Sequence, residues 1–260
     1  MPESTLEAGG RLRLPAEYLA RGDLEPGTRF VFESFEDGLR LHRVRLDARK
    51  AYVEVTTRCN LNCAVCVRQV WTDPGGDMAW ETFEATIEGL RAFPDLRRLV
   101  FGGYGEPLVH QRLPDMLALA STLDVPLTVT TNGLLLDEAM ARSLLAAPVD
   151  WVMISLDTIH SQAYDGANIA GGLQRVLDNA RRLMQLAEQA GGPPINLGFE
   201  FVATRSNREH LASLRDVAHD LGASRVLVSN LLPYTEAMCD EILYDSDEPL
   251  SLPLSWPMSF

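Results

Sequence analysis

Three of the four cysteines in this chain lie close together, at Cys59, Cys63 and Cys66, with the spacing C-x3-C-x2-C. In a reducing compartment, thiols this close in sequence serve as metal ligands or redox groups more often than as structural disulfides. The spacing therefore predicts a metal or iron–sulfur site on this segment.

Zinc and an iron–sulfur cluster are the two alternatives for such a site. A structural zinc ion takes four nitrogen or sulfur ligands, and no His or Cys follows Cys66 at zinc-finger spacing. Cys239 is far along the chain, and we expect it to be a free thiol. Three thiolates on a four-iron cluster leave one iron without a protein ligand, and that iron can bind a small molecule.

Composition limits the other classes of function. The 46% hydrophobic and 23% charged residues are typical of a soluble globular protein, and the net charge of -13 argues against nucleic acid as the main partner. We expect no signal peptide, no membrane span and a cytoplasmic location. Lys50 is the only lysine, and it lies outside any glycine-rich phosphate loop, so neither a phosphate loop nor a pyridoxal Schiff base is expected.

Two hydropathy patterns divide the chain. Residues 1–48 alternate apolar and polar positions between turn signals, which predicts a small β-rich module. From residue 51 onward, short runs rich in Val, Ile and Leu alternate with segments of helical period. We expect strands at Ala51–Thr56, Arg98–Gly102, Leu127–Thr131, Trp151–Leu156, Ile195–Val202 and Arg225–Ser229.

This alternation of strands and helices predicts βαβ units and a parallel sheet, either an open doubly wound sheet or an incomplete (β/α) barrel. Ligands of both architectures gather at the carboxyl ends of the strands. The residues that could bind a ligand or take part in a reaction follow the first four strands: Cys59–Cys66, Tyr104 to Pro107, Thr131 to Gly133, and Ser155 to Asp157.

Four motifs of this chain resemble, in type and order, those of the radical SAM superfamily. They are the cysteine spacing, "GGYGEPL" (102–108), "VTTNG" (129–133) and "ISLDT" (154–158). The resemblance covers roughly residues 50–244. It implies an α/β fold with a partial (β/α)6 TIM-type barrel over 49–244, a [4Fe-4S] cluster on the three cysteines, and S-adenosylmethionine (SAM) as the second cofactor. The implied reaction is reductive cleavage of SAM, which yields methionine and a 5′-deoxyadenosyl radical that abstracts hydrogen from a substrate.

The resemblance also implies which residues contact SAM. The backbone at Val65 would read the adenine, and Ser155, with Asp157, would bind the ribose hydroxyls. Gly105 and Glu106 would lie against the methionine amine. The remaining implied contacts are Gly103, Tyr104, Thr131, Asn132 and Asn168. No acid–base residue is assigned, because hydrogen abstraction needs none.

Two positions depart from the family pattern. Val65 stands where relatives often carry an aromatic residue, and Asn168 stands where they often carry an arginine. Asparagine cannot form the bidentate bond of a guanidinium with a carboxylate. Replacing Asn168 by Arg is therefore expected to tighten SAM binding in a calorimetric titration.

Several residues also have structural interpretations. Ser155 and Asp157, taken alone, fit a strand end and a helix cap. Glu200 and Asn230, at later strand ends, fit either the lining of the pocket or, as we prefer, ordinary barrel-rim positions. Arg68 fits either the cluster site or a helix surface. His110 fits a role in positioning its neighbours rather than in catalysis.

The line "GRLRLPAEYL" near the N-terminus resembles an AbrB-type swapped-hairpin module. Together with "YVEVTTRCNLNCAVCVRQVW" and "NLLPYTEAMCDEILY", it resembles radical SAM maturases associated with tungsten-cofactor oxidoreductases. The resemblance implies a peptide or protein substrate, such as a tungsten-dependent oxidoreductase or its cofactor, and a reductant such as ferredoxin or flavodoxin. A non-catalytic Fe–S/SAM-binding scaffold and an AbrB-type regulator are the alternatives.

Residues 245–260 carry three prolines and no periodicity, so we expect an irregular tail. Such maturases usually continue into a cysteine-rich extension that binds auxiliary clusters. With only Cys239 left over, this chain would be a fragment, a natural short form or a truncated reading frame that ends before that extension.

Overall fold

The computed structural model describes residues 6–7, 11–12, 14, 16–21, 28, 30–35, 38–43, 48–72, 74–156, 172–191 and 195–243. The chain divides into two compact units, Met1–Asp47 and Ala48–Phe260. Asp157, Asn168 and the predicted irregular tail lie outside the described residues.

The N-terminal unit is built from short antiparallel strands, as the alternating pattern predicts. Strand β1 (Leu6–Glu7) pairs with β2 (Arg11–Leu12), and the six-residue helix α1 (Ala16–Arg21) follows. Strands β3 (Phe30–Phe35) and β4 (Gly38–Arg43) form an antiparallel hairpin in which Phe35 faces Gly38. The β-rich character of this unit is confirmed, and its AbrB likeness stays a prediction.

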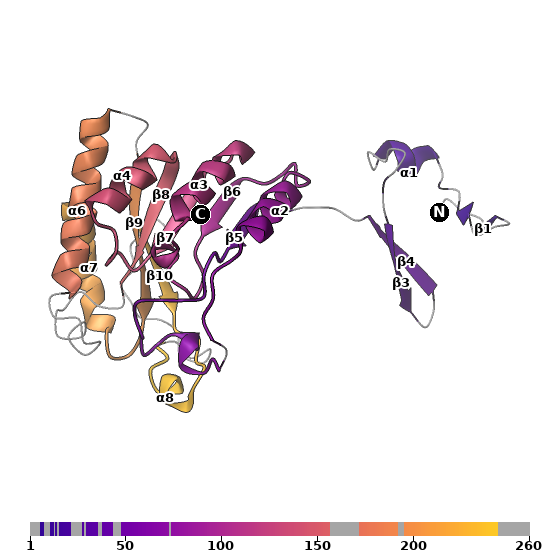
Figure 1. Ribbon diagram of the computed structural model, residues 1–260. Helices are drawn as coiled ribbons and strands as arrows, with labels where there is room; N and C mark the ends of the chain where they lie inside the picture. Colours follow the sequence, from indigo (N-terminus) through magenta and orange to yellow (C-terminus); the bar gives the residue numbers. More distant parts are fainter. Residues whose placement is uncertain are drawn as a thin grey trace. The chain divides into compact units, whose positions relative to one another are not determined.

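The second unit contains a six-stranded sheet in which every pairing is parallel. Its strand order is β10-β9-β8-β7-β6-β5, so chain order and spatial order agree throughout (Figure 1). The strands are β5 (Lys50–Val53), β6 (Arg98–Phe101), β7 (Leu127–Thr131), β8 (Val149–Ser155), β9 (Asn196–Ala203) and β10 (Arg225–Asn230).

Helices connect these strands and lie along one side of the sheet (Figure 1). They are α2 (Trp80–Leu90), α3 (Leu113–Ala120), α4 (Glu138–Ala146), α6 (Gly172–Ala190) and α7 (Leu211–Asp220), with the short α8 (Glu236–Cys239) after β10. Single 3₁₀ turns occur at η1 (Val67–Gln69), η2 (Pro107–Val109), η3 (Ser121–Leu123) and η4 (Arg208–His210).

The sequential strand order decides between the two predicted architectures. Crossover connections between parallel strands are right-handed, so crossovers that all step in one direction place every helix on the same face. A doubly wound sheet would instead reverse its order at a switch point. The sheet is therefore a half-barrel, and the partial (β/α)6 prediction is confirmed.

The core lies between the sheet and its helices. On β9, Leu197, Phe199 and Phe201 are fully buried. Since side chains alternate along a strand, Glu200 and Val202 point to the opposite, concave face. The 19-residue helix α6 buries Val176, Ala180 and Leu183, which closes the helix side of the sheet.

The first barrel strand is shorter than its hydrophobic run predicts. Strand β5 ends at Val53 rather than Thr56. Beyond it, the Val55 carbonyl accepts a hydrogen bond from Met78, at 2.8 Å, and Thr56 forms an antiparallel bridge with Asp77. The backbone groups that would have extended the parallel ladder are thus used by the returning end of the cysteine-containing loop.

Within the described residues, no helix combines the length and the apolar character needed to cross a bilayer.

Candidate functional site

The cysteines lie on a loop whose two ends are fastened together. The Thr57 amide donates to the Gly76 carbonyl at 2.9 Å, and the Thr56 hydroxyl donates to Asp77 Oδ1 at 2.7 Å. Arg58 forms an ion pair with the same carboxylate, and its Nε donates to Oδ1 at 2.9 Å. Burial raises the pKa of Asp77, but the bonds from Thr56 and Arg58 outweigh it and hold that pKa below its usual value.

Cys59, Cys63 and Cys66 are thiols that belong to no disulfide. The Cys59 sulfur accepts the Leu61 amide at 3.4 Å and lies 3.9 Å from Asn132 Nδ2. Burial raises the pKa of the Cys59 thiol. The Cys66 amide donates to the Cys63 carbonyl at 3.2 Å, and this turn leads directly into η1.

The loop after β6 packs directly against the cysteine loop. A side chain at Gly105 has no room, because its Cβ would lie 1.9 Å from the Thr56 carbonyl oxygen. The Glu106 amide donates to the Arg58 carbonyl at 2.8 Å. Glycine is therefore required at position 105 for the two loops to approach backbone to backbone.

A carboxylate from the first barrel strand's end orients this loop. Glu54 Oε1 accepts the Tyr104 amide at 2.6 Å and the Gly105 amide at 2.9 Å. Gly103 adopts φ 148°, and a Cβ there would lie 2.5 Å from the same carboxylate oxygen. Sequence reasoning missed Glu54, since one glutamate in an alternating strand is indistinguishable from a solvated one.

Glu106 joins the β6 loop to the end of β7. Its side chain is 2% exposed and accepts hydrogen bonds from the Thr131 hydroxyl at 2.7 Å, the Asn132 amide at 2.7 Å and the Leu108 amide at 3.0 Å. Burial raises its pKa, although these three bonds act in the opposite direction. Asn132 Nδ2 in turn donates to Asn60 Oδ1 at 2.8 Å, which ties β7 to the cysteine loop.

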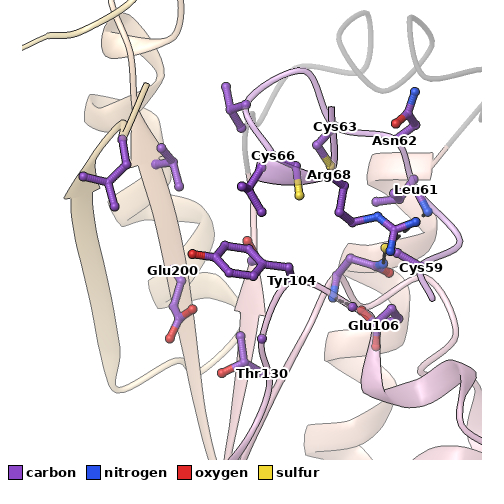
Figure 2. A pocket seen from close by; sticks show the side chains of 18 of the residues that line it. Cys59, Leu61, Asn62, Cys63, Cys66, Arg68, Tyr104, Glu106, Thr130 and Glu200 are labelled. Carbon is purple, nitrogen blue, oxygen red and sulfur yellow. Dashed lines mark hydrogen bonds between the residues drawn. The ribbon is translucent and has the colours of Figure 1, made fainter. Parts of the chain in front are cut away.

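These loops surround one cavity of about 330 Å³ at the carboxyl ends of the strands (Figure 2). The three cysteines and eight of the ten predicted SAM contacts line it; the eight are Val65, Gly103, Tyr104, Gly105, Glu106, Thr131, Asn132 and Ser155. The other two, Asp157 and Asn168, lie outside the described residues. The cavity wall also includes Arg68, Glu200 and Asn230.

Aromatic residues from three segments meet beside this cavity. The Tyr104 ring contacts Trp71 edge-on, with 5.6 Å between the ring centroids, and its hydroxyl lies 3.2 Å from the Tyr234 hydroxyl. Tyr234 lines the cavity. It lies in the segment "NLLPYTEAMCDEILY" that resembles the maturases, but the sequence assigns it no site role, because it follows the sixth strand and belongs to none of the four superfamily motifs.

Two residues left open by the sequence have defined contacts. His110 is 5% exposed, its Nδ1 accepts the Arg112 amide at 3.1 Å, and its Nε2 lies 3.3 Å from the Met78 carbonyl. It therefore connects η2 to the end of the cysteine loop. Arg68 donates to the Thr57 carbonyl, while its buried Nε has no partner among the described residues.

The donor set at this cavity fits a cluster with one open iron. Three thiols line the wall, and Cys239 is exposed on α8. Across the described part of the chain, no three His, Cys, Asp or Glu side chains are already gathered closely enough to hold a metal ion. The three cysteines fit a four-iron cluster by their chemistry, since three thiol groups line one cavity. The loop that carries them is held in place at both of its ends.

A parallel half-barrel with such a cavity at its strand ends defines the class of protein. The chain belongs to the radical SAM superfamily, whose family profile matches residues 53–218. Among curated proteins it is 35% identical, over 75% of this chain and 54% of the relative, to the tungsten-containing aldehyde ferredoxin oxidoreductase cofactor-modifying protein of Pyrococcus furiosus. It is also 30% identical to the PqqA peptide cyclase of Granulibacter bethesdensis, over 70% of this chain and 46% of that enzyme.

Solved structures share the fold. Streptococcus suis SuiB bound to S-adenosylmethionine superposes with a TM-score of 0.61 at 17% identity, covering 73% of this chain and 42% of SuiB. Methylornithine synthase (PylB) gives a TM-score of 0.57 at 14% identity, covering 72% of this chain and 55% of PylB. The chain spans about half the length of the curated relatives named above.

Proposed function

We propose that this chain is a radical SAM enzyme in which Cys59, Cys63 and Cys66 hold a [4Fe-4S] cluster and the adjoining cavity binds SAM. One observation carries the proposal: the cysteines and the ends of β6, β7 and β8 line the same cavity. When bound, the cluster and SAM would supply reductive carbon–sulfur cleavage, giving methionine and a 5′-deoxyadenosyl radical.

The chain's own residues would bind and orient these groups. Gly105 lets the loop after β6 pack backbone to backbone against the cysteine loop at the cavity wall, and Glu106 is held by three hydrogen bonds so that its position is fixed. Ser155, at the end of β8, offers a hydroxyl to the ribose. Asp157 and Asn168 are proposed as further contacts. Cys59 would have to lose its proton when the cluster is loaded, and the free energy of metal binding would drive this deprotonation.

The substrate is proposed from the relatives. The identity with the Pyrococcus furiosus cofactor-modifying protein favours a peptide or cofactor acted on during maturation of a tungsten-type oxidoreductase, with ferredoxin or flavodoxin as reductant. If so, adding a tungsten-dependent oxidoreductase in its apo form, or its tungsten cofactor, should stimulate 5′-deoxyadenosine release above that seen with an unrelated protein. Equal release with both would contradict this assignment.

Matched cysteine variants test the cluster assignment. Cys59→Ala, Cys63→Ala and Cys66→Ala are each expected to lose cluster iron and 5′-deoxyadenosine formation after anaerobic reconstitution. Cys239→Ala, which removes an exposed thiol, should leave both unchanged. Full iron content in the first three variants would overturn the assignment.

A further inference from the structure

Glu200 is the acidic residue in the cavity wall that the proposed cofactor contacts do not use. It lies on the concave face of β9, paired in register with Ser155 on one side and Leu227 on the other. Figure 2 shows its carboxylate on the side of the cavity opposite the cysteine loop. A ligand lying between the cysteine loop and the β9–β10 wall would therefore meet Glu200.

The hydrogen bonding of Glu200 differs from that of the two other glutamates near the site. Glu54 and Glu106 use their oxygens to hold loop amides and a hydroxyl. The Glu200 carboxylate forms no hydrogen bond or ion pair within the described part of the chain. An ionised carboxylate can accept about four hydrogen bonds, so Glu200 retains its acceptor capacity for a ligand.

The electrostatic surroundings favour a cationic ligand. Burial raises the pKa of Glu200, and Lys50, whose charge lowers it, does not offset this effect. Lys50 Nζ is itself hydrogen-bonded to the Tyr52 hydroxyl. A partly buried carboxylate left without a partner costs free energy, and a charge-assisted N–H donor removes that cost. An anionic ligand group would increase it.

The remaining wall is suited to an aliphatic chain behind such a donor. Val202 lies two residues further along the same face of β9, and Leu231 and Leu232 follow β10. Methylene groups pack on such surfaces while the charged end reaches a polar partner. The hydroxyl of Ser229, on β10, supplies a neutral polar contact nearby.

We propose that Glu200 forms a substrate subsite that binds an amine or guanidinium on an aliphatic stem, the chemistry of a basic peptide side chain. This inference rests on the proposed function, because it assigns to substrate the part of the cavity that cluster and SAM leave open. Glu200 acts as a specificity-determining residue there: its carboxylate accepts the cationic N–H donors, and the wall formed by Val202, Leu231 and Leu232 packs against the stem.

Matched probe pairs test this subsite. N-acetyl-arginine amide and N-acetyl-citrulline amide differ in the guanidinium charge, and N-acetyl-lysine amide and N-acetyl-norleucine amide differ in the ammonium group. Binding would be measured by ligand-observed NMR on the reconstituted, SAM-loaded protein. We expect each cationic probe to bind about tenfold tighter than its neutral partner. Glu200→Gln should reduce that ratio to below about twofold, whereas Glu188→Gln, on the exposed surface of α6, should leave it unchanged.

Three results would overturn the inference: equal binding of charged and neutral probes, a preference that survives in Glu200→Gln, or a loss of SAM affinity in that variant, which would make Glu200 a SAM contact. Iron content and SAM affinity of the wild-type protein are measured in the same samples. A wild-type protein without cluster or SAM would contradict the proposed function, and this outcome is distinct from failure of the subsite.

Discussion

At the scale of single residues, the site depends on backbone approach as much as on side chains. The Thr56 carbonyl occupies the place where a Cβ of residue 105 would lie. Glu54 uses one carboxylate oxygen to accept hydrogen bonds from two successive amides. These contacts set the shape of the loop that follows β6. Each of the two residues can be tested separately.

Gly105→Ala should distort the site. The added methyl would meet the Thr56 carbonyl at 1.9 Å, and overpacking of this kind costs about 1–3 kcal/mol. We expect a loss of that size in the free energy of unfolding by urea denaturation, together with weaker SAM binding. Gly89→Ala is the control, because it faces open space in α2 and should stabilise the protein by about 0.5–1 kcal/mol. If Gly105→Ala kept the stability and the SAM affinity of the wild type, the assigned role of Gly105 would be contradicted.

Glu54→Ala should release the loop after β6. The Tyr104 and Gly105 amides would lose their acceptor, so hydrogen exchange at both residues should accelerate and SAM affinity should fall. Glu54→Gln keeps an acceptor oxygen, so it should partly restore the slow hydrogen exchange of the loop and its SAM affinity. Glu88→Ala, which removes an exposed carboxylate on α2, should change neither. Unchanged exchange in Glu54→Ala would show that the loop does not need this carboxylate.

At the scale of elements, the strands were largely predictable and the long cysteine loop was not. Leu127–Thr131 was predicted with the bounds that β7 has, because runs of β-branched and apolar residues mark buried parallel strands. The early end of β5 was not predictable, since it depends on Thr56, Asp77 and the Met78 amide meeting across the loop. Contacts between residues so far apart leave no local periodicity.

The cysteine loop should loosen when its ends are released. Asp77→Ala removes the acceptor for Thr56 and the ion-pair partner of Arg58. We expect faster hydrogen exchange across residues 57–76 and faster loss of cluster iron to a chelator, with β-sheet protection retained. Asp95→Ala breaks an exposed ion pair with Arg97 and serves as the control. Chelator kinetics equal to the wild type in Asp77→Ala would show that this clamp does not support the site.

At the scale of the whole molecule, the fold class and the grouping of the motifs followed from the sequence. Six strands with helices between them predict a parallel sheet, and four motifs at strand ends predict one shared edge. The sequence left a half-barrel and a doubly wound sheet as alternatives, and the observed strand order decided between them. The roles of Glu54 and Tyr234 needed the three-dimensional contacts, because a lone Glu or Tyr carries no signal of its own.

Glu200 should also affect the stability of the whole unit in a pH-dependent way. Burial raises its folded-state pKa above the ordinary value of 4.5. The ionised form is therefore penalised at higher pH, and the penalty disappears as pH falls through the folded pKa. Glu200→Gln should raise the free energy of urea unfolding by about 1 kcal/mol near pH 8, and the gain should shrink toward pH 4.5. A gain of equal size at both pH values would contradict this explanation.

The central claim, that this half-barrel binds a four-iron cluster and SAM in one cavity, is tested most directly by electron paramagnetic resonance. The chain would be reconstituted anaerobically with iron and sulfide, reduced, and measured with and without SAM while 5′-deoxyadenosine is assayed. We predict a four-iron signal that shifts when SAM is added, accompanied by nucleoside release. A protein that retains zinc and forms no cluster, or a cluster whose signal SAM leaves unchanged, would contradict the claim.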